Sequence, residues 1–189
     1  MQWYINAVFY QVYLRAFNDS DADGHGDFTG LRQRLDYLQW LGVDCIWIMP
    51  MYRSPLRDDG YDISSFYGIH ETYGVLEEFQ MTVDEIHRRG MRVIVDMVVN
   101  HTSDQHPWFQ EARRSKDSPL RDFYVWSDTD QKYSQTRIIF TDTEPSNWTF
   151  DPVTGEYYWH RFFSHQPDLN YDNPKVRQAM LDIFKFWLE

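Results

Sequence analysis

The sequence predicts an α/β fold: the N-terminal part of a (β/α)8 TIM barrel, with the first three βα units and a small subdomain inserted after the third strand. Strand-like apolar runs alternate with segments whose apolar residues recur at helical spacing, an order typical of right-handed βαβ units and a parallel sheet. The apolar run at residues 92–99 leads directly into Asn100 and His101. Polar groups in that position are typical of the C-terminal end of a barrel strand.

The individual elements follow from the spacing of apolar residues. Strands are predicted at residues 7–17, 43–50 and 92–99. Leu31, Leu35 and Leu38 lie at i, i+4 and i+7 and predict a helix that ends at Gly42. A second helix is predicted at residues 77–89 and ends at the glycine that follows it, because glycine is common just past a helix end.

The alternation of strands and helices fails over residues 102–167, which are rich in aromatic residues, Asp, Ser and Thr and hold short β-like pieces such as residues 137–140. This stretch is too long for an ordinary βα loop, so we predict an inserted, lid-like subdomain. Residues 1–101 are then the first part of the barrel, and residues 168–189 are the return to it.

The last predicted helix has Asn173 as its N-cap and Pro174 at its first position, both favoured there. Its helical pattern continues to Glu189. A complete (β/α)8 barrel needs about 250 residues. We therefore expect the 189 residues to be the N-terminal part of a larger enzyme.

The composition excludes several classes of function. Hydrophobic residues make up 42% of the chain, which indicates a folded core. The formal net charge is −11 and no basic face is evident, which argues against a nucleic-acid partner. Cys45 is the only cysteine, and neither a signal peptide nor a membrane-spanning stretch is recognisable. We expect a cytoplasmic protein without a membrane partner.

Oxygen-bearing side chains recur at alternate positions in the loop at residues 19–27. The candidate ligands are Asp19, Asp21, Asp23, Asp27 and the backbone carbonyl of His25. With a glycine for the sharp turn, this pattern is typical of a hard cation, Ca²⁺ or Mg²⁺. The EF-hand pattern fails because Gly30 stands where a bidentate Glu belongs. A solvated acidic turn is the alternative to a metal loop of another fold.

Two further groups of residues lie where the second and third predicted strands end. Tyr61 offers a flat apolar face and Asp62 a charged acceptor for sugar hydroxyls, although a simple polar turn would also account for them. Asn100 and Asp168 are oxygen donors on either side of the insertion, so one cation could bind both. His101 could donate a hydrogen bond to a sugar hydroxyl.

Together these motifs resemble the α-amylase family of glycoside hydrolases and transglycosylases. The resemblance covers residues 3–189, and its motifs occur in the order of the family: residues 7–11, the Asp-rich loop, and residues 60–62, 96–101 and 166–170. The Gln-Pro-Asp-Leu-Asn motif at residues 166–170 is similar to that of α-glucosidases, oligo-1,6-glucosidases and trehalose synthases. The sequence at residues 57–62, 121–128 and 140–151 is most similar to that of the trehalose synthases.

The resemblance implies roles for the candidate residues. Tyr61 would stack on the glucose in the −1 subsite, and Asp62 and His101 would bind its hydroxyls. Asn100 and Asp168 would hold Ca²⁺. Asp19, Asp21, Asp23 and Asp27, with His25, would hold a second cation, either Ca²⁺ or Mg²⁺.

The chemistry implied by the resemblance is retaining and passes through a covalent glucosyl-enzyme. Trehalose synthases interconvert maltose and trehalose, which are the expected sugar substrates. The nucleophile and the acid/base belong to later strands and lie beyond residue 189, so no catalytic residue is assigned and this chain alone is expected to be inactive. The expected partner is the remainder of the same enzyme or a complementing C-terminal chain, and a homo-oligomer stays open. An α-glucosidase or oligo-1,6-glucosidase of the same branch, or a non-catalytic sugar-binding homologue, is the alternative.

Overall fold

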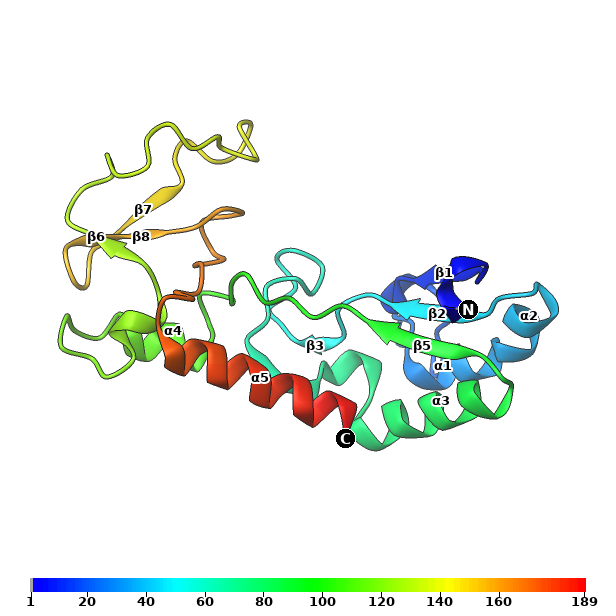
Figure 1. Ribbon diagram of the computed structural model, residues 1–189. Coiled ribbons are helices and arrows are strands. Elements are labelled where there is room, and N and C mark those ends of the chain that lie inside the picture. Colours follow the sequence, from blue (N-terminus) through cyan, green and yellow to red (C-terminus); the bar gives the residue numbers. More distant parts are fainter. Residues whose placement is uncertain (1) are drawn as a thin grey trace. The chain divides into compact units, whose positions relative to one another are not determined.

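The computed structural model describes residues 2–189 (Figure 1), and Met1, the first residue of the predicted barrel segment, lies outside the described residues. The chain forms two compact units. The first comprises residues up to 53 together with 68–97, and the second comprises residues 54–67 together with 98–189. These units do not follow the expected bounds at residues 101 and 167, which stay a prediction about the barrel and its insertion.

The first unit contains a parallel sheet of three strands in the order β1-β2-β5. Its strands are β1 (Phe9–Val12), β2 (Cys45–Ile48) and β5 (Arg92–Val95). Cys45 pairs with Phe9 on one side and with Arg92 on the other, so the predicted parallel sheet is confirmed. The strand predicted at residues 7–17 is wrong in length, because the chain turns after β1 into the 3-10 helix η2 (Leu14–Ala16).

The helix predicted through Leu31, Leu35 and Leu38 is in fact two helices. They are α1 (Phe28–Gln33) and α2 (Leu35–Trp40), separated at Arg34. There the backbone tightens, because the Arg34 amide donates to the carbonyl of Leu31, and the Arg34 side chain is held by Asn18 Oδ1 at 2.9 Å. All three leucines are nevertheless fully buried, so the apolar spacing identified the buried face but missed the break.

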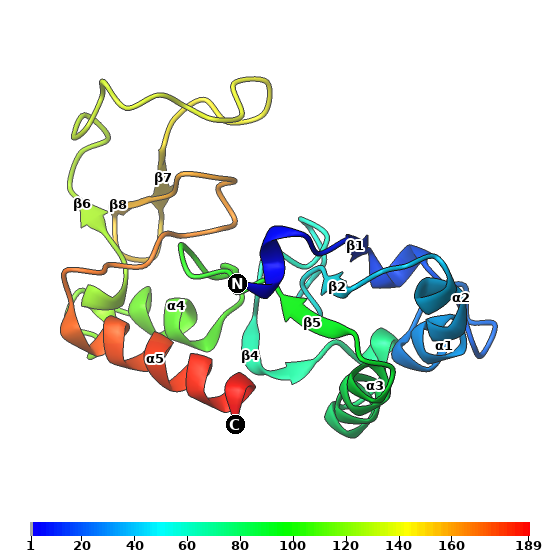
Figure 2. The same ribbon diagram turned by 45° about the vertical axis from the view of Figure 1, so that its right-hand side comes forward.

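Helix α3 (Leu76–Arg88) ends as predicted, with Gly90 in a left-handed conformation at φ +76°. It packs beside α1 (Figure 2), with the rings of Phe28 and Phe79 5.5 Å apart and Arg32 Nη1 donating to the Glu78 carbonyl at 3.0 Å. The first unit also contains η1 (Trp3–Ile5), β3 (Tyr52–Arg53) and η3 (Glu71–Tyr73), and β4 (Ser65–Ile69) is divided between the two units.

The second unit contains an antiparallel sheet in the order β6-β8-β7. Its elements are α4 (Pro107–Ala112), η4 (Arg121–Phe123), β6 (Trp126–Ser127), β7 (Trp148–Asp151), β8 (Glu156–Trp159) and α5 (Pro174–Leu188). The β-like piece predicted at residues 137–140 is not a strand. The aromatic residues of β7 and β8 supply the pairing instead. The start of α5 is confirmed, because Asn173 Oδ1 accepts from the Lys175 amide at 2.9 Å.

The core of this second unit is aromatic. The ring of Phe109 lies 5.0 Å from Tyr124 and 5.0 Å from Tyr158. Arg121 covers Trp126 at 3.3 Å and pairs with Glu156 at 2.5 Å.

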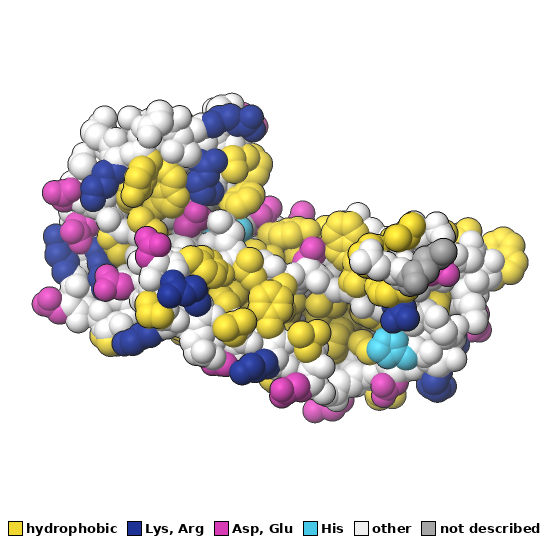
Figure 3. All heavy atoms as spheres, viewed as in Figure 1, with side chains coloured by type: hydrophobic (Ala, Val, Ile, Leu, Met, Phe, Trp, Pro, Cys, Tyr) yellow, Lys and Arg dark blue, Asp and Glu magenta, His cyan; other side chains and the backbone are white. Residues whose placement is uncertain are grey.

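Figure 3 shows that hydrophobic side chains also reach the surface of the molecule. Those on α5 are Leu181, Phe184, Phe186 and Leu188. Among the described residues no helix is both long and apolar enough to cross a membrane.

Candidate functional site

The loop at residues 54–62 is wound around the carboxylate of Asp62, which is fully buried. Its Oδ1 accepts from Ser54 Oγ at 2.8 Å and from the Asp58 amide at 3.1 Å, and its Oδ2 accepts from the Arg57 amide at 3.0 Å. A carboxylate has about four acceptor positions, so three donors leave one position on Oδ2. Asp62 therefore builds its own loop and retains a free acceptor.

His101 lies against this loop. Its Nε2 is 3.2 Å from the carbonyl oxygen of Tyr61, and its ring lies 5.1 Å from that of Phe162. Burial lowers the pKa of His101 to about 4, so the ring is neutral at neutral pH. Because a carbonyl only accepts, Nε2 carries the proton, and Nδ1 accepts from Asn100 Nδ2 at 3.2 Å. A contact from His101 to a sugar hydroxyl must replace its contact with Tyr61, and that role stays a prediction.

The two oxygen donors on either side of residues 102–167 come together. Asn100 Nδ2 donates to Asp168 Oδ1 at 2.8 Å, and the Arg161 amide donates to the same oxygen at 3.1 Å. Burial raises the pKa of Asp168 to about 7, and the hydrogen bonds and the charge of Arg161 offset this loss of water only in part. A bound cation would supply further positive charge. The donor set fits Ca²⁺ when the Asn100 amide turns its oxygen inward, which also gives up the hydrogen bond from Asn100 Nδ2 to His101 Nδ1.

The Asp-rich loop belongs to the first unit. One carboxylate oxygen from each of Asp19, Asp21 and Asp27 lies within 4.8 Å of the others. Asp27 is also the N-cap of α1, with Oδ1 accepting from the Gly30 amide at 2.6 Å. Asp23 is not in this group and accepts from the His25 amide at 2.8 Å. The three carboxylates suit a hard cation, whereas the contribution of Asp23 and of the His25 carbonyl stays a prediction.

Three residues near Asp62 were not singled out from the sequence. Asp104 Oδ2 accepts from Arg57 Nη1 at 3.0 Å, and Gln166 Nε2 donates to Asp58 Oδ2 at 2.7 Å. His165 is buried beside them. Gln166 begins the Gln-Pro-Asp-Leu-Asn motif, so the motif could have marked it as a candidate site residue. No local pattern predicts that its side chain reaches the 54–62 loop.

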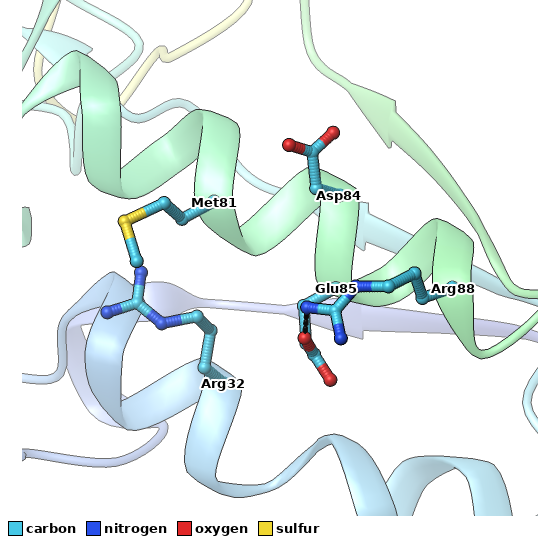
Figure 4. A pocket seen from close by; sticks show the side chains of 5 residues that line it. All are labelled: Arg32, Met81, Asp84, Glu85 and Arg88. Atoms are coloured by element: carbon cyan, nitrogen blue, oxygen red, sulfur yellow. Dashed lines mark ion pairs between the residues drawn. The ribbon is translucent and has the colours of Figure 1, made fainter.

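A surface pocket of about 400 Å³ lies on α1 and α3 (Figure 4), lined by Arg32, Met81, Asp84, Glu85 and Arg88. Glu85 forms an ion pair with Arg88. Arg32 is occupied by Thr29 Oγ1 at 2.6 Å. None of the predicted site residues lines this pocket.

Comparison with known sequences identifies the family. Residues 11–189 match the α-amylase family, described as "Alpha amylase, catalytic domain". The trehalose synthase/amylase TreS of Mycobacterium tuberculosis is 62% identical over 186 residues, which are 98% of this chain and 31% of that protein. The oligo-1,6-glucosidase of Parageobacillus thermoglucosidasius is 46% identical over 189 residues, covering 99% of this chain and 33% of that protein. The chain thus spans about a third of the length of these relatives.

Comparison with solved structures identifies the same fold. A crystal structure of a MutB mutant in complex with the substrate sucrose superposes with a TM-score of 0.92 at 49% identity, over 100% of this chain and 34% of that chain. MutB is a trehalulose synthase from Pseudomonas mesoacidophila MX-45. With the family match over nearly the whole sequence, these similarities show that the chain belongs to the α-amylase family, as an N-terminal part of its TIM-barrel catalytic domain.

Proposed function

We propose that this chain is the N-terminal segment of a retaining α-glucosyl-transferring enzyme that interconverts maltose and trehalose through a covalent glucosyl-enzyme. The observation that carries the proposal is the difference in identity: 62% to a trehalose synthase/amylase, against 46% to an oligo-1,6-glucosidase, over nearly the same residues. The whole enzyme would be a cytoplasmic intramolecular glucosyltransferase, that is, an isomerase of disaccharides.

In this proposal, residues of the second unit bind the sugar. Tyr61 supplies a partly exposed aromatic face for a glucose ring. Asp62 has one acceptor position left after its three hydrogen bonds, which suits a sugar hydroxyl. His101 is neutral, so it can exchange its bond to the Tyr61 carbonyl for one to a hydroxyl without moving charge. The proposal is thus supported by a free acceptor position on Asp62 and an exchangeable hydrogen bond of His101, both beside the ring of Tyr61.

The nucleophile and the acid/base are proposed to lie in the part of the enzyme beyond these 189 residues, since the relatives are about three times as long. Ca²⁺ is proposed between Asn100 and Asp168, where it would hold the two ends of the inserted segment together. A second cation, Ca²⁺ or Mg²⁺, is proposed in the Asp-rich loop. Transfer to a retained glucose requires that water be kept out, and the aromatic segment with Trp148, Tyr158 and Phe162 is the proposed cover.

The test uses the full-length protein that contains this chain. It is incubated with maltose, and trehalose and glucose are quantified over time by anion-exchange chromatography. The proposal is supported when trehalose is the main product from maltose and when maltose is formed from trehalose in the reverse reaction. Glucose as the only product, with cleavage of isomaltose, would instead identify the oligo-1,6-glucosidase alternative favoured by the 46% identity. Binding of maltose without any turnover would identify a non-catalytic homologue.

A further inference from the structure

The Nε2 atom of His165 is buried without a hydrogen-bond partner, and it is the one such side-chain nitrogen or oxygen among residues 2–189. The side chain belongs to a residue that is only 9% exposed. Leaving a buried polar atom unpaired costs stability, and most buried polar groups in folded proteins are therefore paired. Nε2 therefore has a hydrogen-bonding capacity that no group among the described residues meets.

The imidazole is held in place by a stack of aromatic rings and by a backbone contact. It stacks on Phe163 with ring centres 5.2 Å apart and an interplanar angle of 9°, and Phe163 stacks on Phe140 at 4.4 Å. The His165 carbonyl accepts from the Asp104 amide at 2.8 Å. The stack fixes the plane of the ring, and the backbone contact fixes the position of the residue.

Several of the polar groups around the ring are engaged with other groups of the protein. Arg57 is paired with Asp104 at 3.0 Å, and Asp58 accepts from Gln166 at 2.7 Å. The charges of Arg57, Asp58, Asp62 and Asp104 all act on the imidazole. Burial, with the charge of Arg57, lowers the pKa of His165 below its usual value, so the ring is neutral at neutral pH and Nε2 either donates or accepts.

We propose that Nε2 of His165 hydrogen-bonds a hydroxyl group of the sugar bound beside Asp62, and that His165 thereby sets the affinity of this site. The inference rests on the proposed function and adds a binding residue to it. A hydroxyl group both donates and accepts, so it satisfies a neutral imidazole in either tautomer. Three nearby carboxylates disfavour an anion, and a hard cation prefers oxygen to an imidazole nitrogen, so a neutral polyol fits this position best.

The test compares three variants of the full-length protein by calorimetric titration with glucose and maltose. His165→Phe keeps the flat ring on Phe163 and removes the hydrogen bond, whereas His165→Gln keeps a polar group near the position of Nε2. His160→Phe is the matched control, because both ring nitrogens of His160 already have partners, Thr149 Oγ1 at 2.9 Å and the Phe162 carbonyl at 3.0 Å.

We expect His165→Phe to bind glucose about fivefold more weakly than the unmodified protein, with no fall in melting temperature, and His165→Gln to recover part of the affinity. One of the monodeoxyglucoses should bind the unmodified protein more weakly than glucose does, but bind His165→Phe as well as glucose does. His160→Phe should lower the melting temperature and leave the affinity unchanged.

A His165→Phe protein that binds glucose and maltose within twofold of the unmodified protein overturns the inference. A fall in its melting temperature with unchanged affinity does so as well, because Nε2 would then be satisfied by a buried water molecule or by a residue outside these 189. The proposed function fails separately, when maltose is bound but no trehalose forms, and the binding measurements remain decisive for His165 in that case.

Discussion

Ser54 Oγ donates a hydrogen bond of 2.8 Å to the buried carboxylate of Asp62, from the opposite end of the same loop. With the two backbone amides that also bind Asp62, this contact closes residues 54–62 into a compact turn. Two of its non-glycine residues, Leu56 and Asp59, have positive φ angles of 56° and 48°. The loop thus stores backbone strain that the Asp62 carboxylate offsets.

Asp62→Asn should weaken both the loop and sugar binding. An amide group accepts at only one end, so at least one donor among Ser54 Oγ and the Arg57 and Asp58 amides would face an NH2 group. We expect a loss of about 2 kcal/mol in the free energy of unfolding by urea. Ser54→Ala, which keeps the charge, should cost about 1 kcal/mol. Equal stability of Asp62→Asn and the unmodified protein would contradict this role.

Calcium should stabilise the Asp-rich loop by mass action. In thermal melts, Ca²⁺ should raise the melting temperature of the unmodified protein above its value in EDTA. Asp21→Asn should lose this increase, because Asp21 belongs to the group of three close carboxylates. Asp23→Asn should retain most of it, since Asp23 lies outside that group. If Asp23→Asn loses the increase and Asp21→Asn keeps it, the loop binds its cation in a different arrangement.

His106 should make stability depend on pH between about 6.5 and 4. Burial lowers its pKa to about 4, so the folded protein keeps the ring neutral while the unfolded chain takes up a proton below its ordinary pKa of about 6.5. The stabilisation is complete above pH 6.5 and is lost as the pH falls towards 4, by up to about 3 kcal/mol.

The control for His106 is His106→Asn. His106 is the N-cap of α4 and accepts from the Trp108 amide at 3.1 Å, which an Asn oxygen can also do. Urea midpoints measured from pH 4.5 to 7.5 should fall less steeply with acid in His106→Asn than in the unmodified protein. Parallel pH profiles for the two proteins would show that His106 does not contribute.

Arg121 should be a major stabilising residue of the second unit. Its side chain is 9% exposed, lies over Trp126 and pairs with Glu156 at 2.5 Å. Arg121→Lys loses the planar stacking and should lower the free energy of unfolding by about 2 kcal/mol. Lys116→Ala removes a more exposed cation from the same Glu156 and should change stability by less than about 0.5 kcal/mol. Similar losses for the two variants would argue against the special role of Arg121.

Local patterns in the sequence predicted the parallel sheet, the end of α3 at Gly90 and the start of α5 at Asn173. These features depend on backbone preferences and apolar spacing within a few residues, so the order of side chains along the chain determines them. The same is true of the motifs that identified the α-amylase family. By contrast, at the break between α1 and α2 the Arg34 side chain bonds Asn18, sixteen residues away, and the spacing of leucines could not predict this contact.

Only the tertiary structure decided which polar groups meet at the candidate site. Asp58 and Gln166 are 108 residues apart in sequence, yet their side chains share a hydrogen bond of 2.7 Å. His165 carries the same side chain as the exposed His87, and nothing local distinguishes them. One nitrogen of His165 is buried and unpaired. The bond between Asp58 and Gln166 and the unpaired nitrogen of His165 both arise from packing between distant segments. The spacing of residues in the sequence does not predict which polar groups that packing pairs.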